Sequence, residues 1–340
     1  MSTIPITFNR ANETLPAYTV IGGRENLDTT GLSVVLLNRG GRYARRSLFG
    51  DLKKIGFDSV VSVEPAPAHY DIDELSSRFP FVRFVLLQGA LSLGEQINLA
   101  ASELDSPLFF VLWNDLRLLT GGTARRMADR LTRTAEDIGS DTEKSKYKRL
   151  CTVPVMQNSR FETLPTLMIP ALHRKKVRTL SLRIIQEGLP GLYPFDGVGI
   201  YDRERFIRLG GYDGTFKSNY WQLMDFGFRA SLWGEEISAT QSLKLMYESA
   251  VSVEDYSDGK DVSRFYLKNL APVFRNDYAS LPLSRFPGYL LQTSCGILSA
   301  WENFSDCRRW VTTNRYRWRC DLRTVTNRWG VSPAEDTSAS

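Results

Sequence analysis

The sequence predicts an α/β protein with a mostly parallel central sheet, helices on both faces and a helical extension at its C-terminus. Three observations support this fold class. Short, nearly continuous apolar runs have the length of buried strands, stretches with apolar residues at helical spacing separate several of them, and residues 265–329 read mainly as helices and loops. Because crossovers between parallel strands are right-handed, the loops that follow the strands meet at one rim of such a sheet.

The first half of this sheet is expected within residues 31–118. Four apolar runs predict its strands, GLSVVLLN, DSVVSVEP, FVRFVLLQG and LFFVLWND. Two stretches predict helices, RYARRSLFGDLKKIG and the capped SLGEQINLAASELDS. The first thirty residues are polar and irregular, so we expect them to form an arm.

The second half is expected within residues 119–255. An amphipathic helix in GGTARRMADRLTRTAEDIG runs into a charged loop and is followed by the strand RLCTVPVMQ. Residues 166–184 read as two strands around a basic turn. A strand that contains Gly197 and Gly199 then leads to a short helix capped by Asp202 and to the helix YWQLMDFGFRASLWG. A last strand pair ends near AVSVEDYS.

Polar residues stand at the carboxyl ends of the four predicted strands of the first half. In chain order they are Asn38 and Arg39, Glu64, Gln88 and Gly89, and Asn114 and Asp115. A single polar strand end only reaches water, but four of them converge on one rim of a parallel sheet. The sequence therefore predicts a binding site at this rim.

The composition excludes several classes of protein. With 340 residues, 42% apolar and 24% charged, the chain is expected to be a globular protein with a sizeable core. Its four cysteines have no metal-ligand spacing, so we expect reduced thiols and no zinc site. Because we find neither a signal-peptide pattern nor an apolar segment long enough to cross a bilayer, we expect a cytoplasmic protein.

The net charge of +5 is concentrated late in the chain, in CRRWVTTNRYRWRCDLRTVTNRW. Arginine interleaved with tryptophan is suited to nucleic acid, anionic lipid headgroups or a phosphate-bearing acceptor. The simpler interpretation is a terminal helix that packs its aromatic residues and solvates its arginines. Among the binding roles we favour a peripheral membrane contact or an envelope acceptor over nucleic acid.

Five segments occur in an order that is known from one protein family. They are SVVLLNRGG, SLGEQINLAASEL, FFVLWNDLRL, FDGVGIYDRERFIRLGGYD and WQLMDFGFRASLWG. Together they cover most of residues 31–256 and resemble the GT-A glycosyltransferases of the large family-2 type. The resemblance implies a Rossmann-like GT-A domain whose first half binds a nucleotide-sugar donor and whose second half binds the acceptor.

The resemblance also implies roles for single residues. Residues 110–118 look like the strand that ends in the family's DxD-type motif, so Asp115 would bind Mn²⁺ or Mg²⁺ and the donor diphosphate. Asn38 and Glu64 would lie near the nucleoside, and Asn98 would hold the loop beneath the phosphates. The residues implied for the nucleotide sugar are Asn38, Arg39, Glu64, Gln88, Asn98, Asn114, Asp115 and Gly197, with Asp196 also near the sugar.

The chain departs from the family pattern at three places. Trp113 stands where members often have a first acid, so one carboxylate does the work of two or metal dependence is weak. The metal-binding histidine is missing, and Glu254 or Asp255 would replace it. In the family an acidic pair supplies the catalytic base, but here Gln222 and Leu223 stand at those positions. The remaining candidates for the base are Asp225, Asp196 and Asp213.

The sequence thus predicts a glycosyltransferase, with a divalent cation as its cofactor and a sugar or lipid-linked acceptor. The alternative is a catalytically silent relative that keeps the fold as a binding or scaffold protein. The expected domains are an arm at 1–30, a GT-A domain at 31–255 that divides at 118, a helical extension at 256–330 and a tail at 331–340.

Overall fold

Four parallel strands form the N-terminal part of the central sheet. The computed structural model describes residues 17–25, 30–39, 45–65, 71–119, 123–137, 148–173, 176–248, 260–293, 295–327 and 329. The four strands lie side by side in the order β4 (Val82–Leu87), β3 (Val60–Glu64), β2 (Leu32–Leu37) and β5 (Leu108–Trp113). Every residue of β2 and β3 is buried. The four predicted strands and their parallel pairing are confirmed.

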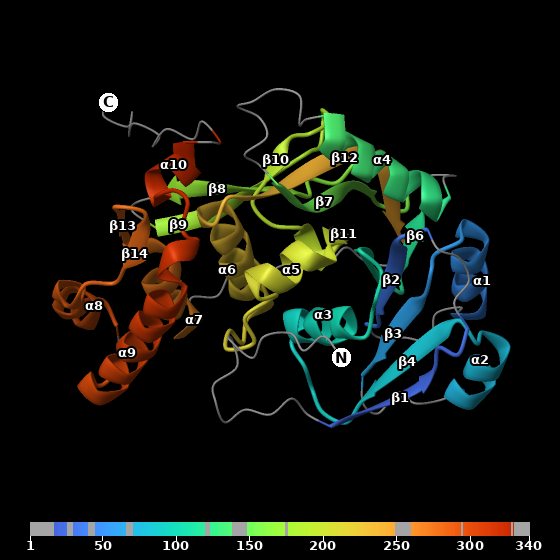
Figure 1. The fold of residues 1–340 in the computed structure, drawn as a ribbon, viewed down its shortest axis with the longest axis horizontal. Helices are drawn as coiled ribbons and strands as arrows, with labels where there is room; N and C mark the ends of the chain where they lie inside the picture. The colour runs from blue at the N-terminus through green and yellow to red at the C-terminus, as the bar shows by residue number, and fades with distance from the viewer. Residues whose placement is uncertain are drawn as a thin grey trace.

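Three helices connect these strands, namely α1 (Arg45–Ile55), α2 (Ile72–Arg78) and α3 (Leu93–Ser102). Figure 1 shows α1 and α2 on one side of the strands and α3 on the other. A capping box starts α3, in which Ser92 and Glu95 each accept a hydrogen bond from the backbone N–H of the other. The capped helix is therefore confirmed, whereas α2 is missing from the prediction because seven residues show too little of a helical period.

An edge strand, β1 (Tyr18–Gly22), lies in the segment expected to form an arm. It pairs antiparallel with β4, from Tyr18 opposite Leu87 to Gly22 opposite Arg83. The arm prediction is wrong for these residues. An edge strand need not be buried on both faces, and the side chains of β1 are exposed or half-buried, so its sequence lacks the long apolar run of the central strands.

The C-terminal part of the sheet is mixed. β11 (Gly199–Asp202) lies antiparallel between β5 and β7 (Lys148–Gln157), and β12 (Glu235–Tyr247) runs parallel to β7. Two short strands, β6 (Leu116–Leu118) and β10 (Pro190–Gly191), pair antiparallel with β12. The sheet is thus parallel in the predicted nucleotide half and mixed beyond it. The segment AVSVEDYS lies outside the described residues.

Further elements pack around this mixed half. They are α4 (Ala124–Asp137), the hairpin of β8 (Leu167–His173) and β9 (Lys176–Leu182), the short helix η4 (Phe195–Gly197), α5 (Arg203–Leu209) and α6 (Asn219–Leu232). The predicted hairpin is confirmed, and Asp202 caps α5 through the Arg205 backbone N–H at 2.9 Å. Every residue of α6 from Tyr220 to Leu232 is buried, so this helix forms a central part of the core.

The C-terminal extension is mainly helical, as predicted. Its elements are α7 (Lys260–Phe265), the π-helical turn η5 (Tyr266–Leu270), β13 (Val273–Arg275), β14 (Tyr278–Ser280), η6 (Leu283–Arg285), α8 (Phe286–Gln292), α9 (Ile297–Asn314), η7 (Arg315–Arg317) and α10 (Leu322–Asn327). It packs on the end of α6, where Trp233 stacks on Trp310 and tilts against Trp318. The tryptophans of the basic C-terminal stretch at 310 and 318 are buried while its arginines at 308, 309 and 315 are exposed, so this segment packs these aromatic residues and leaves these arginines at the surface.

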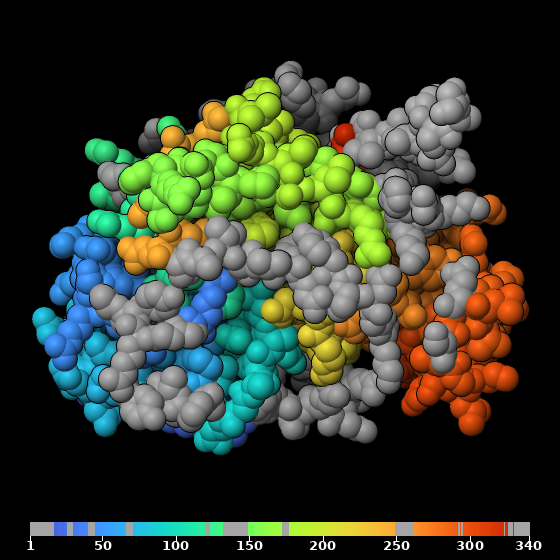
Figure 2. Space-filling view, turned by 180° about the vertical axis from the view of Figure 1, so that it is seen from behind, coloured from blue at the N-terminus to red at the C-terminus, as the bar shows by residue number. Residues whose placement is uncertain are grey.

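The N-terminal strands and the C-terminal extension lie at opposite ends of the molecule. From behind, β8 and β9 spread across the upper part of the surface between these two ends (Figure 2). No helix in the described residues is long and apolar enough to cross a membrane.

Candidate functional site

Five side chains from four parts of the chain meet at the rim of the sheet. We call them the Arg39 cluster, and they are Arg39, Trp113, Asp115, Asp196 and Tyr247. Arg39 follows β2, Trp113 ends β5, Asp115 lies in the turn to β6, Asp196 lies in η4 and Tyr247 ends β12. The polar ends of neighbouring strands therefore come together where the sequence predicted a site.

Main-chain hydrogen bonds hold Asp115 in place. The N–H of Asn114 donates to the Leu37 carbonyl at 2.9 Å, and the Asp115 carbonyl accepts from the N–H of Glu248 at 2.9 Å. The Asn114 side chain also accepts from the N–H of Arg39 at 3.2 Å. The turn after β5 is thus tied to both β2 and the end of β12, and the Asp115 carboxylate is buried.

The Arg39 guanidinium binds both carboxylates of the cluster. Its Nε lies 3.0 Å from Asp115 Oδ2 and its Nη2 3.2 Å from Asp115 Oδ1, while Nη1 lies 2.6 Å from Asp196 Oδ2. The guanidinium carbon stands 4.2 Å above the Trp113 ring and 5.5 Å from the Tyr247 ring. A planar cation that stacks on aromatic faces and pairs with two acids is held in one geometry.

Asp196 adopts a left-handed backbone conformation, with φ 56°. The Trp113 indole N–H donates to its carbonyl at 3.0 Å, and the Tyr247 hydroxyl donates to its Oδ2 at 3.1 Å. Such a conformation is uncommon for a residue other than glycine and persists only where the surroundings impose it. Burial raises the pKa of Asp196 and outweighs the lowering effect of Arg39.

A second polar group adjoins the cluster through the neighbouring residue Asn38. Its Nδ2 donates to the Val63 carbonyl at 2.7 Å and lies 3.4 Å from Glu64 Oε1. Glu64 is fully buried, pairs with Arg45 at 2.9 Å and accepts from the Ser62 hydroxyl at 2.7 Å. Within the described residues, the buried Oδ1 of Asn38 accepts no hydrogen bond, so this atom can accept one from a ligand.

Four other residues predicted for the site belong neither to the Arg39 cluster nor to the Asn38–Glu64 group. Gln88 is exposed at the end of β4, where its N–H donates to the Ala17 carbonyl. Asn98 binds the backbone N–H and carbonyl of Tyr212 at 2.9 and 2.7 Å, so it holds the loop before α6. Gly197 follows Asp196 with φ +71°, and a Cβ there would lie 3.0 Å from Ile97. Glu254 lies outside the described residues.

Asp225 lies in a buried network of charges. Its Oδ1 is 2.8 Å from Lys268 Nζ and 2.9 Å from Asn269 Nδ2, and its Oδ2 is 3.0 Å from Arg229 Nη2. Asp213 joins the network through Lys268 at 2.6 Å. Because both oxygens of Asp225 are buried and paired, this environment contradicts a role as the base and instead gives Asp225 a structural role.

The positions where the resemblance places an acidic pair also have structural roles here. The Gln222 side chain accepts from the Gly94 N–H at 2.8 Å and donates to the Ser92 hydroxyl and the Asp213 carbonyl, both at 3.0 Å. Leu223 is buried in the core. Gln222 therefore joins the start of α3 to α6.

Sequence reasoning missed three members of the site. Tyr247 and Trp113 enclose Arg39, and Arg45 pairs with Glu64. The only signal for Tyr247 is a polar-tipped aromatic residue at the end of a strand, and Arg45 reads as one of several cations on an ordinary helix. Such pairings depend on which strands become neighbours.

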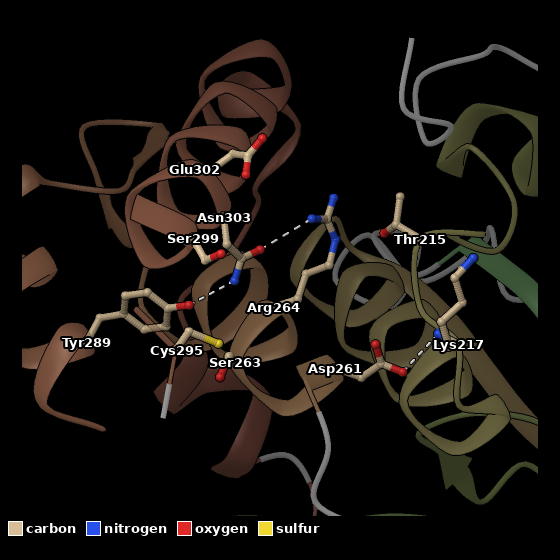
Figure 3. A pocket seen from close by; sticks show the side chains of 10 residues that line it. All are labelled: Thr215, Lys217, Asp261, Ser263, Arg264, Tyr289, Cys295, Ser299, Glu302 and Asn303. Atoms are coloured by element: carbon tan, nitrogen blue, oxygen red, sulfur yellow. Dashed lines mark hydrogen bonds between the residues drawn. The ribbon is translucent and has the colours of Figure 1, made fainter. Parts of the chain in front are cut away.

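A separate cavity of about 290 Å³ lies between the start of α6 and helices α7 to α9 (Figure 3). The Arg264 guanidinium extends between Thr215 and α9, with Nη1 3.5 Å from Asn303 Oδ1. In the described part of the chain its buried Nε has no hydrogen-bond partner. None of the residues predicted for the donor lines this cavity.

The donor set of the Arg39 cluster does not suit a divalent cation. Magnesium and manganese prefer several oxygen ligands, yet both Asp115 oxygens and the Oδ2 of Asp196 already accept from Arg39. The described residues contain no group of three or more His, Cys, Asp or Glu side chains that could hold a metal ion.

No protein family model matches the chain, and no curated protein sequence matches it. Among solved structures it is similar to GalNAc-T7 with UDP, GalNAc and Mn²⁺, at 11% identity and TM-score 0.47 over 83% of this chain and 56% of that one. It is also similar to S. aureus TarS 1–349, at 16% identity and TM-score 0.43 over 82% and 80%, and to the same protein with UDP-GlcNAc, at 12% and 0.44 over 83% and 72%. The chain spans little more than half the length of the GalNAc-T7 chain.

Proposed function

We propose that the chain is a glycosyltransferase that transfers a sugar from a nucleotide-diphosphate donor. The observation that carries the proposal is the junction of the Arg39 cluster with the Asn38–Glu64 group at the carboxyl ends of β2, β3 and β5. In open α/β sheets this rim is where ligands bind. A guanidinium beside buried carbonyl, amide and carboxylate groups offers the mixture that a nucleoside diphosphate requires.

We assign the donor to the two groups by their chemistry. Asn38 and Glu64 would bind the nucleoside, because a buried amide oxygen and a buried carboxylate both accept hydrogen bonds from a base or a ribose. Arg39, held by Asp115 and the Asn114 side chain, would bind the diphosphate. Gly197 would adjoin the sugar through its backbone, while its missing side chain leaves room for Ile97 and Leu93 of α3 to pack behind it.

Asp196 is the acid that we propose for proton transfer from the acceptor. Its contacts with Arg39 and Tyr247 both end at Oδ2, so we assign Oδ1 to the acceptor hydroxyl. A general base works best with a pKa near the working pH, and burial raises the pKa of this carboxyl. Asp225 is not available for this role, since it is enclosed by its own ion pairs.

For the acceptor we propose a glycan or a lipid-linked sugar of the cell envelope, reached by a cytoplasmic protein at the membrane surface. Support comes from the exposed arginines of α9 and η7 and from the exposed apolar side chains of α8 and α9, which include Leu291, Ile297, Leu298 and Trp301. Anionic vesicles should bind the protein more strongly than neutral ones, and equal binding would contradict this assignment.

The test of the donor site is a calorimetric titration of UDP, GDP and dTDP into the wild type and Asp115→Asn. We expect one nucleotide to bind, and we expect the substitution to weaken it at least about tenfold, since Arg39 loses a charged partner. Asp202→Asn, at the cap of α5, is the matched control and should bind as the wild type does. If none of the nucleotides bound, or if Asp115→Asn had no effect, the proposal would fail.

A second readout separates turnover from binding alone. An enzyme of this kind consumes its nucleotide sugar slowly even without an acceptor, with water in place of the hydroxyl. Release of free nucleotide from the matching donor would support the transferase. Tight binding of the donor with no consumption, with or without an acceptor extract, would instead support a catalytically silent binding protein.

A further inference from the structure

We propose that the Arg39 guanidinium is the resident cation of the donor site and takes the place that a divalent metal ion would have between Asp115 and Asp196. The inference rests on the proposed function for the identity of the donor. It goes further in stating that the donor binds without a metal ion and that Arg39 is the residue responsible.

The first support is the occupation of the carboxylates. Arg39 reaches both oxygens of Asp115, at 3.2 and 3.0 Å from Nε, and the Oδ2 of Asp196 at 2.6 Å from Nη1. A metal ion between the two acids would have to displace this side chain. Within the described residues, Asp115 and Asp196 are not joined by further acids, histidines or cysteines into a larger group that could hold a metal ion, so an ion could use these two carboxylates only after Arg39 had left them.

The second support is the way in which Arg39 is packed. Its guanidinium lies 4.2 Å from the Trp113 ring and 5.5 Å from the Tyr247 ring, and both aromatic side chains are buried. Each ring is also tied to Asp196, Trp113 through its indole N–H and Tyr247 through its hydroxyl. Arg39 therefore sits in a slot built for a flat cation, in which a compact metal ion would leave the ring faces uncovered.

The third support is the hydrogen-bonding capacity that remains. A guanidinium has five N–H bonds, and one from each nitrogen is used on the two carboxylates. Tyr247 is a further side-chain hydrogen-bond partner of Arg39, so within the described residues at least one N–H bond remains for a phosphate oxygen, at a side chain that is one quarter exposed. With both acids ionised, the three groups carry one net negative charge. Diphosphate binding would then depend on directed hydrogen bonds to Arg39 rather than on net charge.

Removal of Arg39 should reveal the metal site that it replaces. In Arg39→Met the stem can still pack on Trp113, but two buried carboxylates would face each other without a cation. Like charges at close range repel strongly in a buried site, and a divalent ion would relieve this repulsion. In the wild type Arg39 already neutralises these carboxylates, so we expect no binding of a divalent ion there.

The experiment measures Mn²⁺ binding by the loss of the free-ion electron paramagnetic resonance signal, with no nucleotide present. We expect no binding to the wild type and one ion bound to Arg39→Met, whose melting temperature should also rise with Mn²⁺. The matched control is Arg205→Met, which breaks a pair with Glu235 outside the cluster and should not bind Mn²⁺. An ion bound at this site in the wild type would overturn the proposal.

A second arm measures nucleotide affinity by calorimetry in EDTA and in Mn²⁺. The wild-type dissociation constant should change by less than about twofold, and that of Arg39→Met in EDTA should rise at least about tenfold. A tenfold gain for the wild type on adding Mn²⁺ would overturn the proposal. If Arg39→Met did not fold, the two wild-type measurements would still decide the question. If no nucleotide bound under either condition, the proposed function would fail. The Mn²⁺ binding experiment uses no nucleotide, so it would still test whether Arg39 occupies the place of a metal ion.

Discussion

At the scale of single residues, the members of the Arg39 cluster hold one another in position. Asp196 is held in its left-handed conformation by Trp113, Tyr247 and Arg39, which come from β5, β12 and the end of β2. The strain of such a conformation is of the order of 1–3 kcal/mol and has to be met by the surrounding contacts. The carboxyl group is thereby fixed beside the proposed donor rather than left on a mobile side chain.

Tyr247→Phe tests this arrangement at the level of one hydrogen bond. Loss of the hydroxyl that donates to Asp196 should lower the free energy of unfolding by about 1 kcal/mol in urea denaturation. Because the lost bond stabilises the ionised carboxylate, the pKa of Asp196 should rise further. The acid limb of donor consumption against pH should then move to higher pH.

The control for this substitution is Tyr18→Phe, whose hydroxyl makes an exposed hydrogen bond to Glu103 outside the cluster. It should leave both the unfolding free energy and the pH profile unchanged. A normal acid limb in Tyr247→Phe would remove Asp196 from the role of base, even if the stability change were as expected.

At the scale of elements, α6 is the helix to which the other parts of the fold are joined. Its Gln222 receives the N–H of Gly94 at the start of α3, its Asp225 binds both Arg229 and Lys268, and Trp233 at its end stacks on Trp310 of α9. A helix buried along nearly its whole length has no face left for solvent. The residues that would carry acid–base chemistry on this helix are used for packing.

Gly94→Ala tests the contact between α3 and α6. A Cβ at this position would lie 2.7 Å from the Gln222 side chain and even closer to the Cβ of Tyr212, which cannot move away without its backbone. We expect a loss of about 1–3 kcal/mol in the free energy of unfolding, more than the higher helix propensity of alanine can offset. Gly50→Ala in α1 is the matched control, because a Cβ added there would have no atom of the described residues within 4 Å and alanine should stabilise the helix by up to about 1 kcal/mol. Equal effects at the two glycines would contradict the packing described.

At the scale of the whole molecule, a buried charge network joins the C-terminal extension to the central domain. Lys268 of η5 is fully buried and lies 2.6 Å from Asp213 and 2.8 Å from Asp225. Its ammonium also stands 4.3 Å from the Trp310 ring of α9. Removing one partner of a buried pair commonly costs about 3–5 kcal/mol. The expected boundary near residue 255 therefore does not separate two independent packing units.

This network predicts a pH-dependent part of the stability. Burial raises the pKa of Asp213, but the charges of Lys268 and Arg264 outweigh it and lower the pKa to about 2 from 3.8. A lowered folded-state pKa adds stability that is present above the unfolded value and is lost as the pH falls through the folded one. The difference in unfolding free energy between wild type and Asp213→Asn should thus shrink by roughly 2 kcal/mol between pH 5 and pH 2. A difference that stayed constant over this range, measured by urea denaturation, would show that Asp213 is not held in its ionised form.

Much of the fold could be predicted from the sequence because the signals are local. The four central strands are long apolar runs, the start of α3 has Ser92 three residues before Glu95, and Asp202 stands at the start of α5. The convergence of Asn38, Glu64 and Asp115 also follows from the strand pattern, since parallel neighbours place their carboxyl ends on one rim. β1 and α2 escaped prediction because an edge strand and a helix of two turns leave little periodicity.

The sequence alone therefore determined where the central strands begin and end and which loops share one rim of the sheet. It also places an acid, Asp115, at that rim. Tertiary packing alone decided what those groups do. Arg39 meets Asp196 and Tyr247 only because β5 pairs with β11 and β6 pairs with the end of β12, and Asp225 became an internal ion pair only because η5 covers α6. These partners lie dozens or hundreds of residues apart in the sequence, so only the packing of the whole chain brings them together. No short stretch of sequence is sufficient to specify such a pairing.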